Sequence, residues 1–168
     1  SRYAELDEFL TLRSQSIIQP LAISSTEFIK NNQRNQLRHL IGFAHRSQPD
    51  IVKSIAIFTT DNEVLVTSVY NGDINQMRLK LGENIPLSLS HAHHDDYVIF
   101  RAPIIDETSE LNERGKIQNS QQNLGYITLK IDKSKVAFHQ QSQILATFTI
   151  VFLGSLISAL FSLLLIRH

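Results

Sequence analysis

The sequence contains no cysteine and no tryptophan, and its positive and negative charges cancel. Without cysteine, the chain forms no disulfide bond, has no thiolate nucleophile and cannot build a metal site on sulfur. Lysine plus arginine number 16 and aspartate plus glutamate number 16, so the formal net charge is zero. We therefore expect no nucleic-acid binding, because neither a basic field nor a basic helix face is present.

Catalytic motifs are also missing from the sequence. It has no glycine-rich phosphate loop, no GxSxG and no HExxH. We therefore predict that this chain is not an enzyme and holds no cofactor. It begins with Ser1 rather than methionine, so we expect it to be part of a longer protein.

The last quarter of the chain holds a long apolar run. Residues 144–166 contain no charged side chain. A helix of this length spans roughly 34 Å, whereas the hydrocarbon core of a bilayer is roughly 30 Å thick. We predict a transmembrane helix at 144–166, a folded domain over 1–143 and the start of a further segment at 167–168.

The first third of the chain has the apolar spacing of amphipathic helices. Residues 1 to about 30 are expected to be helical, with Pro20 kinking or ending the helix. The apolar residues near one face of this helix are Tyr3, Leu6, Leu10, Ile17 and Leu21. After a polar run, a second amphipathic helix begins near residue 37 and stops before Pro49.

The apolar period then changes from about 3.6 to 2. The stretches expected to be strands are 51–58, 64–70, 97–104 and 124–131. Between them we expect a long irregular segment at 71–96 and a mobile polar insert at 106–123. This order predicts an α+β fold, in which a long N-terminal helix packs on a central antiparallel sheet and a transmembrane helix follows.

Several segments resemble a known family. They are IIQPLA (17–22), DIVKSIAIF (50–58), VTS (66–68), FRAPII (100–105) and NLGYITLKID (123–132). In this order and spacing they resemble the sensor region of the BarA-type hybrid sensor histidine kinases of gammaproteobacteria.

The resemblance implies a Cache or PAS-like sensor domain, periplasmic over residues 1–143 and anchored in the bacterial inner membrane. The helix at 144–166 would be the second of two membrane helices, and the first would precede Ser1. A cytoplasmic kinase would follow residue 168 and signal to a response regulator. The family also suggests short-chain carboxylates, such as formate and acetate, as ligands.

Arg101 is the candidate anchor for such a ligand. Strand alternation places Tyr97 and Arg101 on one face of the strand at 97–104. A guanidinium presents a planar fork of donors that suits a carboxylate. Tyr97, and Tyr126 on the next strand, could add a hydroxyl and a wall to the same pocket. The alternatives are a solvent-facing Arg101 or one paired with Asp106, and tyrosines that only pack in the sheet.

The stretch HAHHDD at 91–96 is the second candidate site. Imidazoles and carboxylates are ligands for zinc, nickel or copper, so His91, His93 and His94 are candidate metal ligands. His91 and His93 point the same way only if the segment is extended. A solvated polar loop is the simplest interpretation, and a pH-responsive element is a further alternative.

Other functions and partners also remain open. The apolar face of the first helix approaches a heptad pattern, and small residues in 144–166 allow close helix contact, so we expect a homodimer. The same domain could instead serve a chemoreceptor or another membrane signalling protein. It could also be a membrane-anchored metal-binding or pH-sensing module that uses residues 91–96, or an assembly module without a ligand pocket beside Arg101.

Overall fold

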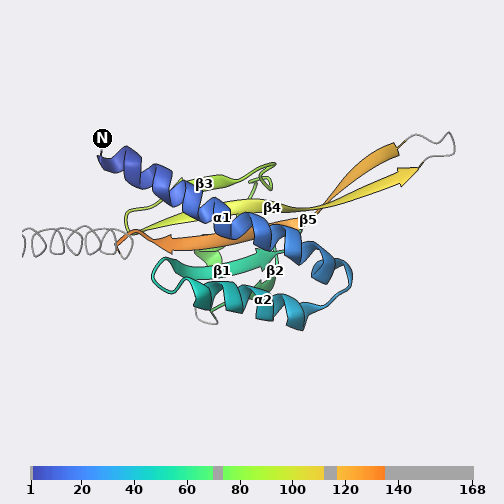
Figure 1. Cartoon of the computed structure of the whole chain (residues 1–168), viewed down its shortest axis with the longest axis horizontal. Coiled ribbons are helices and arrows are strands. Elements are labelled where there is room, and N and C mark those ends of the chain that lie inside the picture. Colours follow the sequence, from blue (N-terminus) through green and yellow to red (C-terminus); the bar gives the residue numbers. More distant parts are fainter. Residues whose placement is uncertain (1, 70–73, 112–116, 135–168) are drawn as a thin grey trace, which may run out of the picture. The chain divides into compact units, whose positions relative to one another are not determined.

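The computed structural model describes residues 2–69, 74–111 and 117–134. In chain order, its elements are α1 (Arg2–Lys30), α2 (Arg34–Ser47), β1 (Val52–Phe58), β2 (Val64–Thr67), α3 (Ile74–Met77), β3 (Ser90–His93), β4 (Tyr97–Leu111) and β5 (Ile117–Asp132) (Figure 1). The chain divides into two compact units, Ser1–Lys133 and Ser134–His168, and all these elements belong to the first.

The predicted transmembrane helix at 144–166 and the predicted boundary at residue 143 lie outside the described residues. Among the helices that the structure describes, none combines the length and the apolar character needed to cross a membrane.

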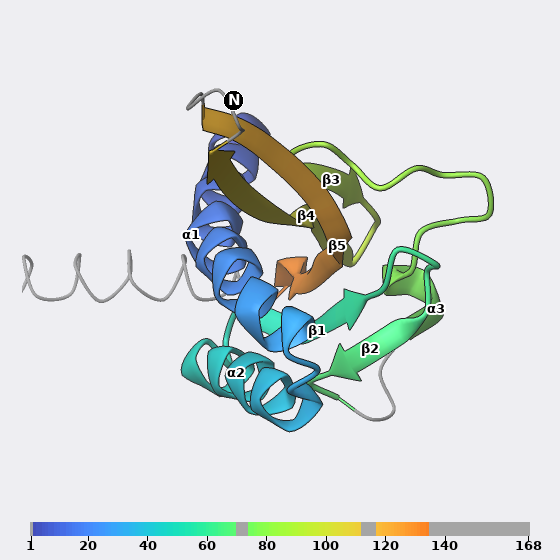
Figure 2. The ribbon, with the colours of Figure 1, turned by 90° about the vertical axis from the view of Figure 1, so that its right-hand side faces the viewer.

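The strands form one five-stranded antiparallel sheet in the order β2-β1-β5-β4-β3. The last strand that the structure describes, β5, is therefore the central one, and it pairs with β1 on one side and β4 on the other. Figure 2 shows α1 and α2 on one side of this sheet and α3 beyond the other. The predicted α+β fold with a long N-terminal helix on an antiparallel sheet is confirmed.

The sheet face toward α1, which we call the α1 face, carries the larger core. Alternate residues of the paired strands point to this side because successive side chains of a strand face opposite ways. On the sheet, its buried members include Val98, Phe100, Ala102, Ile104, Ile127, Leu129 and Ile131. From the helices, Leu10, Ile18 and Leu21 of α1 and Leu37 and Ile41 of α2 are buried as well. Burying each large aliphatic side chain contributes about 1.5–3 kcal/mol.

The opposite sheet face, which we call the α3 face, has a smaller core. Met77 of α3 and Leu79 pack there against Ala56, Phe58 and Tyr126. The Tyr126 and Phe58 rings stack, with their centroids 4.9 Å apart and their planes 9° from parallel. Residues 74–79 of the connection from β2 to β3 are thus fixed to the sheet by apolar contacts.

A sharp irregularity interrupts the β4–β5 ladder. The pairing register shifts between Ile104 and Ile105, opposite Gly125, which has a φ of +143°. A Cβ atom at Gly125 would lie 2.1 Å from the carbonyl oxygen of Phe58 on β1. Only glycine allows β1 and β5 to approach each other so closely at this point.

Pro20 was predicted to kink or end the first helix. It does not end the helix, because α1 continues to Lys30. Proline removes one backbone donor, which leaves the carbonyl of Ser16 without its usual partner. Both residues are exposed, so water can hydrate that carbonyl and the helix tolerates the proline.

The segment at 106–123, predicted as a polar insert outside the strands, is strand at 106–111 and 117–123. β4 and β5 pair from Ile105 with Asn123 as far as Leu111 with Ile117, as a two-stranded extension of the sheet. In the parts of this ribbon whose burial is described, 106–109 and 119–123, no side chain is buried, but backbone pairing that begins in the sheet continues along it. Polar side chains bond across it: Thr108 with Ser120 (2.7 Å) and Gln121 with Glu107 (2.9 Å).

Candidate functional site

The predicted ligand residues Tyr97, Arg101 and Tyr126 all lie on the α3 face. Tyr97 and Arg101 are two residues of β4 on the same side, and the register pairs Arg101 with Thr128 and Pro103 with Tyr126 on β5. Residues directly opposite each other on paired strands share one face. The predicted shared face of Tyr97 and Arg101 is therefore confirmed, and Tyr126 lies on that face as well.

The guanidinium of Arg101 binds the backbone around the end of α3. Its Nε donates to the carbonyl of Met77 (3.2 Å), and its Nη2 donates to the carbonyls of Arg78 (3.1 Å) and Gln76 (3.5 Å). The last carbonyls of a helix have no partner within the helix, so a fork of donors stabilises them. Asp106, the alternative partner predicted for Arg101, instead forms an ion pair with Lys30 of α1 at 3.0 Å.

Burial lowers the pKa of Arg101, and its interactions with Tyr126 and Glu83 oppose this effect. The side chain is half-buried between the sheet and α3. A guanidinium is more weakly hydrated than an ammonium, so it tolerates such a position better.

A second cation, Lys130 of β5, lies on the same face and was not predicted as a site residue. It is 1% exposed, and its Nζ donates to Oε1 of Gln76 at 2.6 Å. The same Nζ lies 4.2 Å from the centroid of the Tyr97 ring, in a cation–π contact. The alternation in LGYITLKI places Tyr126, Thr128 and Lys130 on one side of β5, so this residue could have been found from the sequence.

Tyr126 connects three parts of the chain. Its hydroxyl donates to Oδ1 of Asn62 and accepts from the backbone N–H of Leu79 at 2.9 Å. Burial raises the pKa of Tyr126, while the bond from Leu79 and the charges of Arg101 and Arg78 oppose the rise. These contacts assign Tyr126 a structural part in holding the segment after α3. Tyr97 stacks on His94, with ring centroids 4.4 Å apart.

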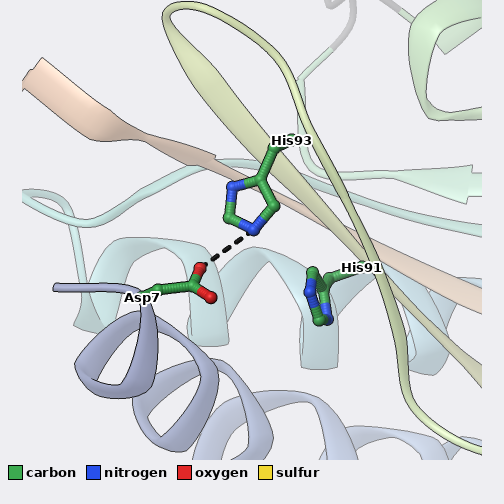
Figure 3. Close-up of side chains that lie close together, drawn as sticks. All are labelled: Asp7, His91 and His93. Atoms are coloured by element: carbon green, nitrogen blue, oxygen red, sulfur yellow. Dashed lines mark ion pairs between the residues drawn. The ribbon is translucent and has the colours of Figure 1, made fainter. Parts of the chain in front are cut away.

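The simplest interpretation, a loop, is wrong for His91 and His93 of HAHHDD, while His94 lies between two strands. Ser90–His93 form β3, an edge strand that pairs with β4 through His91–Phe100 and His93–Val98. His91 and His93 therefore point to the α1 face, and they meet Asp7 of α1 there (Figure 3). His94, which follows the strand, lies apart from this pair, against Tyr97.

Comparison with known proteins identifies the family of this domain. The model of the family described as single Cache domain 4 matches residues 1–144. The chain belongs to this Cache family. The match covers the helices, the sheet and both faces described above, so this Cache domain is a sensor-type domain of the predicted class.

The Cache domain is also similar to curated proteins. It is 34% identical over 145 residues to the signal transduction histidine-protein kinase BarA of Escherichia coli K12, and equally to BarA of Escherichia coli O157:H7 and of Shigella flexneri. The alignment covers 85% of this chain and 16% of each relative. The resemblance to BarA-type kinases is thus confirmed, and the chain spans about a sixth of those proteins.

Proposed function

We propose that this chain is the extracytoplasmic signal-sensing part of a two-component hybrid sensor histidine kinase of the bacterial inner membrane. The Cache match and the similarity to BarA support this assignment. In this proposal, residues 1–143 lie in the periplasm, and the helix at 144–166 crosses the membrane and passes the signal to a cytoplasmic kinase. That kinase then signals to a response regulator.

The proposed ligand is a short-chain carboxylate such as formate or acetate, bound at the α3 face. The observation that carries this proposal is the contact between Arg101 and the carbonyls of residues 76–78. Those carbonyls are neutral acceptors. A carboxylate is charged and can accept two parallel bonds from a guanidinium, and such bonds are roughly twice as strong as neutral ones. A carboxylate therefore competes well with the carbonyls of residues 76–78 for the Arg101 guanidinium.

Binding of this kind would change how α3 is held on the sheet. Gln76 and Met77 contact Arg101, Thr128 and Lys130, so a carboxylate that takes over Arg101 loosens α3 from β4 and β5. Tyr97 and Lys130 lie on the same face and would form the wall and a second positive charge of the site. A ligand changes the balance of two conformations only by as much as its affinities for them differ.

The expected affinity is low. Acetate has four non-hydrogen atoms, and the best very small ligands gain about 1.5 kcal/mol for each, which limits binding to about 6 kcal/mol. The dissociation constant then lies between tens of micromolar and millimolar. This range suits the sensing of an abundant metabolic end product.

The 168-residue chain, solubilised in a mild detergent, is expected to unfold at a higher temperature in acetate or formate than in chloride at equal ionic strength and pH. At a ligand concentration about 100 times the dissociation constant, the free energy of unfolding rises by about 2.7 kcal/mol. This corresponds to several degrees in the unfolding temperature, which circular dichroism can follow.

Arg101→Lys is expected to lose this carboxylate-specific shift, because an ammonium lacks the planar fork of donors. Arg34→Lys is the matched control. Arg34 also donates from Nε to a backbone carbonyl, that of Leu65 at 2.8 Å, but it lies on α2, away from Arg101. Equal shifts in chloride and acetate, or an unchanged shift in Arg101→Lys, would refute carboxylate binding at this site.

We also propose that the chain forms a homodimer through the exposed side of α1. The seam expected from Tyr3, Leu6, Leu10 and Ile17 cannot use Leu10, which is 2% exposed in the core of its own domain. The exposed side carries Leu12 and Ile23, which border a groove together with Gln15, Ser16, Gln19 and Pro20. The spacing of Leu12, Ser16, Gln19 and Ile23 alternates between four and three, as in a helix pair.

Leu12→Glu and Ile23→Glu are each expected to convert a dimer of the solubilised chain into a monomer, because they place a charge in an apolar contact between helices. Sedimentation or light scattering measures the mass directly. Phe43→Glu is the matched control, since Phe43 is a similarly exposed apolar residue on α2. Loss of the dimer in all three variants, or in none, would contradict an interface on this side of α1.

A further inference from the structure

Asp7, His91 and His93 come together on the α1 face from two separate elements (Figure 3). One ligand atom from each residue lies within 4.8 Å of the other two. Nε2 of His93 is 2.9 Å from Oδ1 of Asp7, and the His91 and His93 rings meet edge to face with centroids 5.1 Å apart. This cluster is on the opposite side of the sheet from Arg101.

Both supporting elements are held by their own packing. β3 is paired with β4, and its partners Val98 and Phe100 are buried in the core under α1. The His91 ring lies 5.8 Å from the Phe100 ring. On the helix, Asp7 is one turn before the buried Leu10, so both point toward the sheet. Two histidines at i and i+2 on a paired strand share one direction, which is the condition for them to bind one ion.

The carboxylate of Asp7 has an acceptor that is not satisfied. Its Oδ1 is shielded from solvent, and among the described residues no donor forms a hydrogen bond with it. The contact with Nε2 of His93 has the distance of a hydrogen bond, yet its geometry does not make one. A carboxylate oxygen that has lost water and has only this poorly aligned donor is costly, and a cation placed between it and the imidazoles would remove that cost.

We propose that Asp7, His91 and His93 form a binding site for a divalent transition-metal ion, with Zn²⁺ as the best match. Two imidazoles and one carboxylate are a donor set that zinc accepts, and water completes the four ligands. Ligand bonds of about 2.0–2.1 Å require the three donor atoms to lie roughly 3.4 Å apart, so small side-chain rotations complete the geometry. The side chains of Asp7 and His93 are nearly half exposed, which lets the ion enter.

A metal ion bound here would join the N-terminal part of α1 directly to the edge strand β3. Without the ion, Asp7 and His93 are joined by their ion pair. The site therefore offers a second input to the sensor domain, on the face opposite the proposed carboxylate site. It does not depend on the proposed function, because its residues and its ligand are different.

The test is a calorimetric titration of the untagged 168-residue chain in detergent with Zn²⁺, with Mg²⁺ as the comparison ion. We expect one Zn²⁺ to bind per chain and no heat with Mg²⁺, which prefers oxygen ligands. Co²⁺ in place of Zn²⁺ should give the visible absorption of a four-coordinate site. Asp7→Asn and His93→Ala should each weaken Zn²⁺ binding at least about tenfold.

Two neighbouring residues provide matched controls. Glu8→Gln changes the adjacent, exposed carboxylate on α1, and His94→Ala removes a histidine next to β3 that lies against Tyr97. Both should bind Zn²⁺ as the parent chain does. Circular dichroism confirms that each variant is folded, and Asp7→Asn is conservative enough to remain so.

Hydrogen exchange gives a second readout. Zn²⁺ should slow amide exchange in the first turns of α1 by several fold in the parent chain and leave it unchanged in His93→Ala. Absence of saturable Zn²⁺ binding would overturn the proposal and leave an Asp7–His93 ion pair alone. Equal loss of binding in His94→Ala or Glu8→Gln would overturn it too, because binding would then be a general property of the exposed histidines and acids.

Discussion

Gly125→Ala is expected to lower the free energy of unfolding by about 3–5 kcal/mol. The new Cβ would lie 2.1 Å from the carbonyl oxygen of Phe58, a separation that side chains do not adopt, so β1 or β5 must move. The φ of +143° adds backbone strain of about 1–3 kcal/mol for a residue with a side chain. Denaturant unfolding followed by circular dichroism measures the loss.

Gly82→Ala separates these two causes. Gly82 also has a positive φ, +87°, but a Cβ added there meets no atom within 4 Å. We expect this substitution to lower the free energy of unfolding by about 1 kcal/mol, because only the backbone conformation becomes unfavourable. If Gly125→Ala costs no more than Gly82→Ala, the close approach of β1 to β5 does not constrain the sheet as described.

Tyr126→Phe is expected to lower the free energy of unfolding by about 2 kcal/mol. The substitution keeps the ring that stacks on Phe58 and removes only the hydroxyl. The buried N–H of Leu79 then loses its acceptor, and a buried donor left without a partner costs about 1–3 kcal/mol. The loss of stability should be greatest near Leu79, so hydrogen exchange of the Leu79 amide should accelerate more than exchange of amides in β5.

Tyr97→Phe is the control for the loss of a tyrosine hydroxyl from the same face. Among the described residues, the Tyr97 hydroxyl forms no hydrogen bond, while its ring contacts the Lys130 ammonium and His94. Since phenylalanine keeps the ring, we expect a change within about 0.5 kcal/mol. Equal effects of the two substitutions would mean that the Tyr126 hydroxyl does not hold the segment after α3.

Periodicity predicted the fold well where one side of an element is buried. Alternation over residues 97–104 fixed the direction of Arg101, and the apolar spacing of Leu37 and Ile41 identified α2, because burial against one partner imposes these patterns. In the β4–β5 ribbon beyond Ile105, the residues whose burial is described (106–109 and 119–123) are polar and none is buried, so they carried no apolar strand pattern. β3 was missed for the same reason, as an edge strand of four residues.

The candidate sites depended on long-range contacts that no local pattern contains. The sequence indicated that Arg101 needs a partner, but that partner is backbone, the carbonyls of residues 76–78 some two dozen positions earlier. Backbone acceptors are the same at every residue and leave no signature in the sequence. Asp7 likewise lies far from His91 and His93 in the chain, and only the packing of α1 on the sheet brings them together.

The place of β5 in the sheet determines how the domain bears a mechanical load. A pull on its end at Asp132 acts on a strand flanked by β1 and β4, so β5 slides only if both ladders shear together. Edge strands such as β2 and β3 would instead peel, one bond after another. Because many bonds in parallel make shear stiff, we expect the strand from which the polypeptide continues beyond Asp132 to resist sliding more than an edge strand does. A small displacement there is carried across the whole sheet instead of being absorbed by one strand.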